Sequence, residues 1–529
     1  MDCVPLLKGL LPHRVEVLPY CGTRLPHDEG RIRESGRSSQ ARNGVPGGEM
    51  FRNQMPRYEV LSESAMEALD AGWRRLLTEV GVEFVSDQAL ELFRAAGQKV
   101  EDGTVYLDPD FVLDQVGKAP REFDVAARNP EHSIHIGGDA MSFGAVYGPP
   151  FVREGDVRRD ATMDDFRNFT RLAQSYSVLD SAGGVICEPS DAPLDSRHLD
   201  MTYALQTLTD KVYMGNVVSG VNARDTIAMS EILFGGREAI EQNPVSISLI
   251  NCNSPLRWDE RMLEAQLEYC AAGQPVVLTP FLLMGAMSPV TIPAALVQQI
   301  AEALSGIALA QLIRPGTPVI FGSFLSNIDM QSGSPQFGTP ESGLGLLCTG
   351  QIARRFGLPF RSGGGLTSSQ VPDAQAGYEA LMTLLPTFLA GANWVMHSAG
   401  WLEGGLVAGY EKFVIDTQLL EMLQVEFTPL EINEDTLAFD AHVEVGHGGH
   451  FLGAMHTMER FRTCFYRPFL NSSDNYERWM SKGEGADTAA RAAKQWRERL
   501  EEFEPPPLDD AIRTELEEYV VRRRAELGD

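Results

Sequence analysis

The sequence predicts an α/β protein built on a TIM-type (β/α)8 barrel, with an N-terminal α+β subdomain and a C-terminal helical extension. Eight apolar, β-prone runs follow one another between residues 140 and 430, and segments of helical periodicity separate them. Eight strand–loop–helix units over about 290 residues match the size of a barrel, whereas doubly wound sheets usually have fewer strands. A large open α/β sheet is the alternative that this pattern leaves.

The first 139 residues are expected to form two parts. Residues 1–55 predict a poorly ordered leader, because 31–48 are rich in Arg, Ser, Gly and Asn and offer little to bury. Residues 56–139 predict an α+β subdomain. Apolar residues recur at helical spacing from Met66 to Val80, and Gly81 follows as a helix stop. A second helix over 87–96 and small strands around a further helix between 100 and 136 complete this part.

The barrel domain is expected over residues 140–430. Its predicted strands are 141–147, 179–187, 212–218, 245–252, 276–283, 319–325, 359–365 and 393–397, and its predicted helices include 164–176, 195–208, 259–271, 294–313, 342–356, 376–390 and 411–423. Residues 431–529 are expected to form a loop and helical extension. Its helices over 486–503 and 509–524 are separated by three consecutive prolines, which stop the first of them.

Composition excludes several kinds of partner. Lys and Arg total 45 against 73 Asp and Glu, so the formal charge of −28 repels nucleic-acid backbones and anionic membrane surfaces. Residues 271–301 carry no charge and are long enough to span a bilayer, but four prolines divide them, as expected of a buried strand, a loop and a helix start. Neither nucleic acid nor a membrane is therefore expected as a partner.

The cysteines and the first thirty residues bear on the compartment. The seven cysteines form no C-x-x-C pair, which is typical of reduced thiols in the cytoplasm. The N-terminal residues lack the uninterrupted apolar core and the cleavage site of a signal peptide. We therefore expect a cytoplasmic protein.

Several barrel chemistries lack their required residues. Because barrel active sites lie at the carboxyl ends of strands, a Schiff-base enzyme needs a lysine there, and no predicted strand ends in one. Neither a G-x-x-x-x-G-K-[ST] nor an H-E-x-x-H motif is present. His447, His450 and His456 have ligand-like spacing, so a zinc site remains an alternative.

Glycines and aromatic residues gather at the predicted strand ends. Gly363, Gly364 and Gly365, with Gly404 after the last strand, allow three interpretations: a phosphate-binding turn, a close approach of a large flat ligand, or a tight structural turn. Phe324 and Trp401 would supply the aromatic lining that a quaternary ammonium prefers. Packing in the core is the alternative for each ring.

The stretch Gly364-Gly365-Leu366-Thr367, followed by Val371-Pro372-Asp373-Ala374-Gln375-Ala376-Gly377-Tyr378-Glu379, resembles the signature of the corrinoid-dependent trimethylamine methyltransferase family. Tyr147-Gly148-Pro149-Pro150 and Gly448-Gly449-His450-Phe451-Leu452-Gly453 are similar to further parts of that family, and the likeness extends from about residue 60 to the C-terminus. The resemblance implies a TIM barrel that transfers a methyl group to the Co(I) corrinoid of a separate partner protein, with no tightly bound metal of its own.

The sequence departs from the founding members at one informative place. Those members use pyrrolysine near this motif, whereas residues 366–370 contain only standard residues. The relatives without pyrrolysine look like quaternary-amine demethylases, with glycine betaine as the best-known type of substrate. The leaving group is consistent with such a substrate: when a quaternary amine loses a methyl group, a neutral amine departs, so no electrophilic side chain is needed.

The resemblance and the strand-end positions together give the expected site. Trp401, Phe324 and Glu403 are expected near the cation, His397, Asn251 and Gln370 among the polar contacts, and Gly363, Gly364, Gly365 and Gly404 beside the corrinoid. No residue is assigned a catalytic role. Alternatives from other classes are a non-catalytic barrel that binds betaine or corrinoid, and a methyltransferase for trimethylamine or one assisted by zinc. A homo-oligomer is left open.

Overall fold

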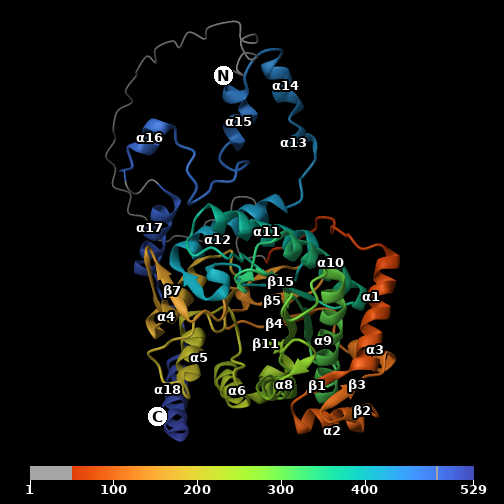
Figure 1. Ribbon diagram of the computed structural model, residues 1–529. Helices are drawn as coiled ribbons and strands as arrows, with labels where there is room; N and C mark the ends of the chain where they lie inside the picture. The colour runs from red at the N-terminus through yellow and green to blue at the C-terminus, as the bar shows by residue number, and fades with distance from the viewer. Residues whose placement is uncertain (1–49, 484–486, 529) are drawn as a thin grey trace. The chain divides into compact units, whose positions relative to one another are not determined.

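The computed structural model describes residues 50–483 and 487–528, and its centre is a parallel barrel (Figure 1). The barrel strands, in spatial order, are β6 (Ser142–Phe143), β18 (Trp394–Met396), β17 (Phe360–Gly363), β14 (Val319–Gly322), β13 (Val276–Met284), β11 (Ser246–Cys252), β10 (Val212–Met214) and β9 (Ser181–Gly183). A parallel bridge between Gly144 and Ser181 joins the first strand to the last. All eight predicted strands are confirmed, and so is the barrel in place of an open sheet.

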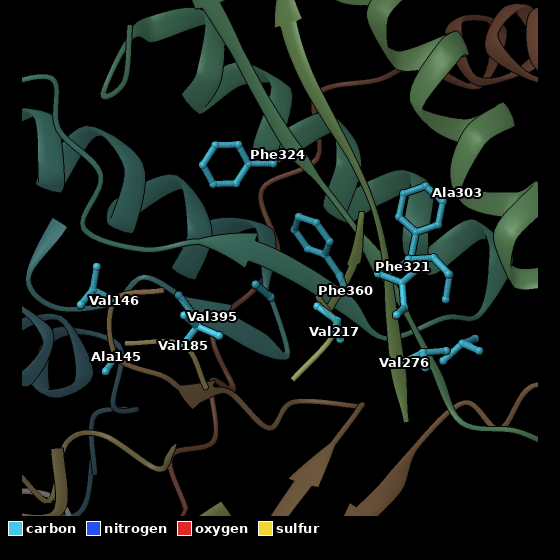
Figure 2. Packing of buried hydrophobic residues seen from close by; sticks show 14 of the residues in the cluster. Ala145, Val146, Val185, Val217, Val276, Ala303, Phe321, Phe324, Phe360 and Val395 are labelled. Carbon is cyan, nitrogen blue, oxygen red and sulfur yellow. The ribbon is translucent and has the colours of Figure 1, made fainter. Parts of the chain in front are cut away.

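Strand residues alternate between the inside of the barrel and its helical shell. Val277 and Ile320 belong to one buried cluster inside the barrel, whereas Val276 and Phe321 pack outward. Figure 2 shows part of the cluster to which Val276 and Phe321 belong, and in it Phe321 lies near Ala303 of a surrounding helix. This period of two explains why the strands read as continuous apolar runs: both faces are buried.

Helices enclose the barrel on its outer side (Figure 1). They are α4 (Met163–Ser175), α5 (Arg197–Leu208), α6 (Gly220–Phe234), α7 (Arg237–Gln242), α8 (Glu260–Ala271), α9 (Ile292–Ile313), α10 (Pro340–Phe356), α11 (Ala374–Ala390) and α12 (Tyr410–Glu426). Polar N-caps set their starts: Thr162 forms a capping box with Asp165, and Asp373 accepts from the backbone N–H of Ala376 at 3.0 Å.

The N-terminal subdomain packs along α9. Its helices are α1 (Glu63–Arg75), α2 (Asp87–Ala95) and α3 (Pro109–Val116), and its sheet has the order β12 (Arg257–Trp258), β1 (Val82–Phe84), β3 (Thr104–Tyr106) and β2 (Lys99–Glu101). Of the described helices, only α9 is long and apolar enough to cross a membrane, and 83% of that window is buried. Because the barrel covers one side of α9 and the subdomain another, a helix apolar on most sides is what this position requires.

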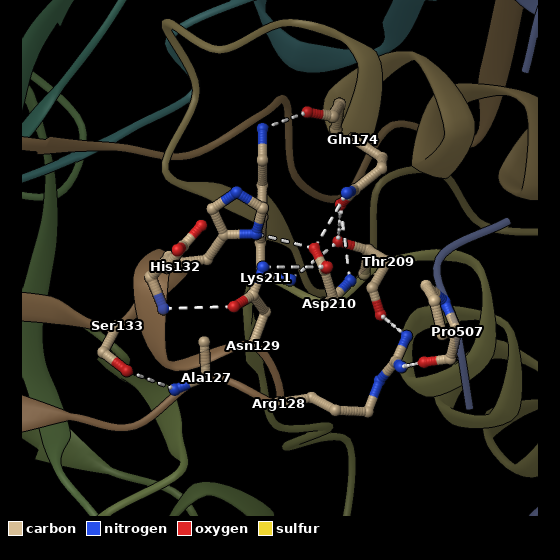
Figure 3. Close-up of polar contacts among 12 residues, drawn as sticks. Ala127, Arg128, Asn129, His132, Ser133, Gln174, Thr209, Asp210, Lys211 and Pro507 are labelled. Carbon is tan, nitrogen blue, oxygen red and sulfur yellow. Dashed lines mark hydrogen bonds and ion pairs between the residues drawn. The ribbon is translucent and has the colours of Figure 1, made fainter. Parts of the chain in front are cut away.

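A small hairpin closes the amino end of the barrel. It consists of β4 (Phe123–Val125) and β5 (Ile134–Ile136), whose apolar residues join the interior cluster. Figure 3 shows how its turn is tied to the strand β10: His132 Nδ1 lies 2.6 Å from Asp210 Oδ1, and Gln174 donates to the same oxygen at 2.8 Å. Next to Asp210, the Lys211 ammonium donates to three carbonyls, of which that of Leu179 is the closest at 2.7 Å.

The extension after the barrel begins with short helices and ends with two long ones. The short ones are α13 (Glu434–Leu437), α14 (Phe439–Val445), α15 (Met455–Arg460) and α16 (Tyr476–Met480), and the long ones are α17 (Thr488–Glu501) and α18 (Asp510–Leu527). Helix α17 packs on α12, and α18 packs on α5 and α6. Asp225 of α6 anchors α18, since it accepts from Tyr519 and Arg523 at 2.8 Å each.

Residues 1–49 of the predicted leader and residue 486 of the predicted tail helix lie outside the described residues. Residues 50–55, which the leader was expected to include, pack against the barrel. Phe51 is buried, and the buried Asn53 amide donates to the carbonyl of Phe388 at 2.7 Å.

Candidate active site

The loops after β6 and β18 build a small sheet at the carboxyl end of the barrel. The strands β7 (Phe151–Glu154) and β8 (Val157–Asp160) follow β6, while β19 (Trp401–Leu402) and β20 (Val407–Gly409) follow β18. Their order is β19-β20-β7-β8. A further strand, β15 (Phe324–Ile328), continues past the end of β14 along β13. These additions bring aromatic side chains to the end at which barrel enzymes carry out their chemistry.

Three of the predicted site residues meet in one cluster of rings. The centroids of His397 and Trp401 lie 4.6 Å apart, and Phe324 lies 5.7 Å from His397 and 5.9 Å from Trp401. Phe337, from the loop before α10, completes the cluster at 5.5 Å from both Phe324 and Trp401. Ring faces that converge at these distances can surround a small organic cation. Figure 2 shows Phe324 above the buried residues of the barrel wall.

His397 is held in an unusual conformation and is uncharged. Its φ is +58°, in the left-handed region that side-chain-bearing residues seldom occupy. Burial, followed by the nearby charge of Arg361, holds the pKa of His397 well below its usual range. The imidazole is therefore neutral near pH 7, so it can donate or accept a hydrogen bond but does not repel a cationic ligand.

Arg361 brings a buried positive charge to the same place. It lies on β17, its guanidinium is 5.2 Å from the centroid of Phe324, and it donates to the Ser323 carbonyl at 2.9 Å. No carboxylate forms an ion pair with it among the described residues. Burial lowers the pKa of Arg361 to about 9, so the group still carries its proton near neutral pH. A buried cation without a counter-ion is costly and is normally kept for an anionic ligand.

Polar atoms without a protein partner accompany this charge. Arg361 Nε, His397 Nδ1 and Trp401 Nε1 are all buried and hydrogen-bonded to no described residue. Buried polar nitrogens are rarely left in this state, because each unpaired donor or acceptor costs about 1–3 kcal/mol. A ligand that combines an anionic group with an organic cation would pair with the N–H groups of Arg361 and Trp401 and occupy the rings together.

The predicted cofactor glycines are packed against the chain itself. A Cβ on Gly364 would come within 2.6 Å of the His397 carbonyl, and one on Gly363 would meet Leu366 at 2.7 Å. A Cβ on Gly365 would lie 3.1 Å from Asp416, and one on Gly404 would lie 3.3 Å from the ring of Phe337. These contacts show that the loops after β17 and β18 pack closely at the glycines, and the expected place of the glycines beside the corrinoid stays a prediction.

A buried ion pair on α12 holds those two loops. Lys412 Nζ lies 2.5 Å from Asp416 and donates to the Gly365 carbonyl at 3.1 Å, while the Gly400 N–H donates to Asp416 at 2.9 Å. Both charged side chains are fully buried. Burial raises the pKa of Asp416 to about 6, although Lys412 acts in the opposite direction.

The signature stretch also has a structural reading. Asp373 caps α11, and Glu379, in the second turn of that helix, accepts from Thr367 Oγ1 at 2.5 Å and from the Ser368 N–H at 2.9 Å. The stretch therefore fixes the loop after β17, beside the rings, through a cap and a carboxylate clamp.

The other predicted site residues are placed differently. Glu403 is largely buried but forms an ion pair with Arg158 at 2.9 Å, so its charge is already neutralised. Gln370 is exposed and donates to the carbonyl of Ser368 in its own loop. Asn251 is partly buried on β11, opposite Thr279. None of these three has a ring or hydrogen-bond contact that brings it to the cluster of Phe324, His397 and Trp401 within the described residues.

Sequence reasoning missed Phe337 and Arg361 as site residues. Arg361 had a usable signal, since it is the one charged residue in the buried run 359–365. Phe337 had none, because the course of the loop between β15 and α10 brings it to the rings. The described residues contain no group of three or more His, Cys, Asp or Glu arranged for a metal, so His447, His450 and His456 do not form such a site there.

A large surface cavity of about 630 Å³ lies away from this cluster. Its lining includes Pro244, Gly273 and Pro318, which precede the barrel strands β11, β13 and β14, so it opens at the amino end of the barrel. Barrel enzymes place their chemistry at the carboxyl end. The fold and the ring cluster therefore define a barrel protein whose carboxyl end is suited to a small ligand with both a cation and an anion.

Comparison with known proteins identifies the family to which the chain belongs. The family described as trimethylamine methyltransferase (MTTB) matches residues 28–528. A glycine betaine methyltransferase from Desulfitobacterium hafniense (strain Y51) is 41% identical over 90% of this chain and 99% of its own length. A proline betaine:corrinoid methyltransferase from Eubacterium limosum is 28% identical over 89% of this chain and 99% of its own length. The chain belongs to the trimethylamine methyltransferase family and is a methyltransferase.

Solved structures support the fold. The monomethylamine methyltransferase of Methanosarcina barkeri superimposes with a TM-score of 0.51 at 11% identity, covering 85% of this chain and 90% of the other. A hydroxylamine complex of this type of enzyme has the same TM-score at 12% identity and the same coverage of both chains.

Proposed function

We propose that this methyltransferase demethylates glycine betaine or a closely similar betaine and transfers the methyl group to the Co(I) corrinoid of a separate partner protein. The single observation that carries the choice of donor is the buried, uncompensated Arg361 beside the ring cluster of Phe324, His397 and Trp401. A betaine offers a carboxylate to the arginine and a quaternary ammonium to the rings. Trimethylamine offers nothing to the arginine.

Each group then has a defined task. Arg361, with the N–H of Trp401, would hold the carboxylate, while the rings of Phe324 and Trp401 would face the ammonium. The C–N bond breaks, its electron pair stays on nitrogen, and the methyl carbon forms a bond to cobalt using the electron pair of Co(I). Dimethylglycine departs as a neutral amine, so no side chain has to supply a proton, and the neutral state of His397 is compatible with that chemistry.

The barrel contributes position and dryness. Phe324, His397 and Trp401 are 5–7% exposed, so a donor between them would be shielded from water once the corrinoid protein covers the carboxyl end.

Reduced corrinoid and free thiols both fit the cytoplasm, which we propose as the compartment. Of the described cysteines, Cys187, Cys252, Cys270 and Cys348 are buried and Cys464 is exposed, and all are free.

The test is methyl transfer to reduced corrinoid under anaerobic conditions. Purified enzyme, glycine betaine and cob(I)alamin, free or bound to a corrinoid protein, should lose the Co(I) absorption band and yield one dimethylglycine per cobalt. Trimethylamine and choline, which lack a carboxylate, should react far more slowly. Failure of every betaine tested to methylate cobalt would leave the non-catalytic binding barrel as the remaining alternative, provided that betaine still binds.

A further inference from the structure

A row of inward-facing residues crosses the barrel wall next to the ring cluster. Val277 lies inside the barrel and side chains alternate along a strand, so Thr279, two residues further along β13, faces inward as well. The strands β13 and β14 run in parallel register, which places Gly322 beside Thr279. Gly322 is paired with Arg361, and Arg361 with Trp394, whose ring belongs to the interior cluster. Four neighbouring strands thus contribute one residue each to what is here called the inner row: Thr279, Gly322, Arg361 and Trp394.

Polar atoms of the inner row lack partners although they are buried. Thr279 Oγ1, Arg361 Nε and Trp394 Nε1 are hydrogen-bonded to no described residue, and each of these side chains is at most 1% exposed. Buried donors of this kind are normally paired with a protein group, an ordered water or a ligand. The inner row therefore offers unpaired donors to a ligand that reaches past the rings.

Gly322 leaves the wall between Thr279 and Arg361 without a side chain. A Cβ at this position would collide with Thr279 Oγ1, and Arg361 donates to the carbonyl of the next residue, Ser323, at 2.9 Å. The hydroxyl and the guanidinium therefore border the same bare stretch of β14. An anion with two oxygens, such as a carboxylate, can accept from both groups at once.

Apolar residues lie before and after the inner row along the strands. Val277 and Ile320, two residues earlier, belong to the cluster that fills the barrel interior. Phe281 and Phe324, two residues later, are paired in register, and their ring centroids lie 5.1 Å apart. Two residues span about 6.6 Å of strand, so the rings lie one layer nearer to the open carboxyl end than the donors do. Glycine betaine has the matching order of groups, with one methylene between its carboxylate and its ammonium.

We propose that Thr279 is a second carboxylate-binding residue beside Arg361, and that the methyl donor binds with its carboxylate toward the barrel interior and its methyl groups toward the open end. This inference rests on the proposed betaine function. The Thr279 hydroxyl donates to one carboxylate oxygen and the Arg361 guanidinium to the other, while Gly322 leaves room for both contacts. The reverse orientation brings the ammonium to the arginine and takes it away from the rings, which like-charge repulsion opposes. In the proposed orientation an N-methyl carbon is the part of the donor nearest to a corrinoid that covers the carboxyl end.

Ligand binding measured by calorimetry without corrinoid tests Thr279 directly. Thr279→Val keeps the shape of the side chain but removes the hydroxyl, and it should raise the Kd of glycine betaine about tenfold to a hundredfold, as expected for a hydrogen bond to a charged group. The Kd of tert-butylacetate, in which carbon replaces the betaine nitrogen, should rise by a similar factor because the carboxylate is the same. The Kd of choline, which has no carboxylate, should not change. Thr279→Ser restores a hydroxyl and should recover most of the affinity for both carboxylates.

Thr170→Val is the matched control. It removes a buried hydroxyl that donates to the Phe166 carbonyl at 2.8 Å within α4, and it should bind all three ligands as wild type does. Unchanged betaine affinity in Thr279→Val would overturn the proposal, because a water molecule rather than the ligand would then be the partner of the hydroxyl. An equal loss for choline would overturn it as well, since Thr279 would then only shape the pocket.

Methyl transfer to cob(I)alamin separates this inference from the proposed function. If wild type methylates cobalt from glycine betaine and Thr279→Val binds betaine normally, only the role of Thr279 fails. If no betaine methylates cobalt but Thr279→Val loses affinity for betaine and tert-butylacetate, the role of Thr279 stands and the proposed methyl transfer fails. A wild type that binds neither carboxylate would overturn both.

Discussion

Trp401 is the residue on which cation binding in the proposed site depends most. Its ring lies 4.6 Å from His397 and 5.9 Å from Phe324, and it is 6% exposed. Trp401→Ala should weaken glycine betaine binding by about 1–2 kcal/mol, since a partly desolvated ammonium loses its strongest ring. Isothermal titration calorimetry with wild type, Trp401→Ala and Trp401→Phe measures the effect, and Phe should retain part of the affinity.

The matched ligand is tert-butylacetate, which has the shape and the carboxylate of glycine betaine but a carbon in place of nitrogen. Its affinity should change much less than that of betaine on Trp401→Ala, because the cation–π attraction is missing from the start. An equal loss for both ligands would mean that Trp401 provides shape rather than attraction for the charge.

Asp210 gives the clearest pH dependence of stability. Burial acts to raise the pKa of Asp210, but hydrogen bonds from His132, Gln174 and Asn129 outweigh it and lower the pKa to about 2 (Figure 3). A carboxyl with a lower pKa in the folded than in the unfolded state stabilises the fold above the unfolded value of 3.8. That contribution, about 2 kcal/mol, is lost as the pH falls from about 4 toward 2.

Asp210→Asn should therefore lower the free energy of unfolding by about 2 kcal/mol near pH 7 and by much less near pH 2.5. Urea unfolding followed by fluorescence at the two pH values measures both differences. Asp124→Asn is the control, because Asp124 also contacts a histidine, at 2.7 Å from His135, but its side chain is 82% exposed. A loss for Asp210→Asn that does not vary with pH would show that shape, not charge, is what the network requires.

At the scale of elements, periodicity predicted the barrel well because both faces of each strand are buried. The predicted helices 259–271 and 342–356 differ from α8 and α10 by at most two residues at either end. The additions at the carboxyl end were not predicted: β7, β8, β19 and β20 are two to four residues long, and their pairing joins segments about 250 residues apart. Short strands paired over such distances leave no local pattern.

The candidate site, like the fold, could be predicted from the sequence only where the barrel strands determine it. Strand ends identified Phe324, His397 and Trp401, whose rings do meet. They also suggested Gln370, which the loop after β17 turns outward. A position at a strand end fixes which end of the barrel a residue occupies, but the loop conformation fixes the side-chain direction.

The ion pair on α12 is expected to act as one structural unit. Asp416→Ala should cost about 3–5 kcal/mol, because it leaves the fully buried Lys412 without its counter-ion. Lys412→Met should cost a similar amount for the converse reason. The double variant Lys412→Met with Asp416→Leu should be more stable than either single one, since neither charge is then stranded. Urea unfolding of the four proteins completes the cycle, and additive losses would contradict the coupling.

The same cycle has a functional readout. The pair holds the Gly365 carbonyl and the Gly400 N–H, which belong to the loops that carry the rings. The double variant should therefore bind betaine more weakly than wild type even where its stability recovers. Unchanged affinity would show that the loops keep their positions without the pair.

At the scale of the whole molecule, stability and ligand binding are linked. A ligand that binds only the folded state stabilises it by about 2.7 kcal/mol at a hundred times its Kd, which is roughly 3 °C in the thermal midpoint for a chain of this length. Glycine betaine should produce this shift in the wild type at millimolar concentration without any corrinoid.

Arg361→Met should abolish most of the shift, because the carboxylate loses its buried cation. Arg224→Met, which removes an exposed arginine paired with Glu268, should leave it intact. Choline has the ammonium but no carboxylate, so any shift it causes should be the same in wild type and in Arg361→Met. If betaine stabilised Arg361→Met as strongly as wild type, Arg361 would not be the group that holds the carboxylate, and the argument for a betaine over an amine without a carboxylate would fail.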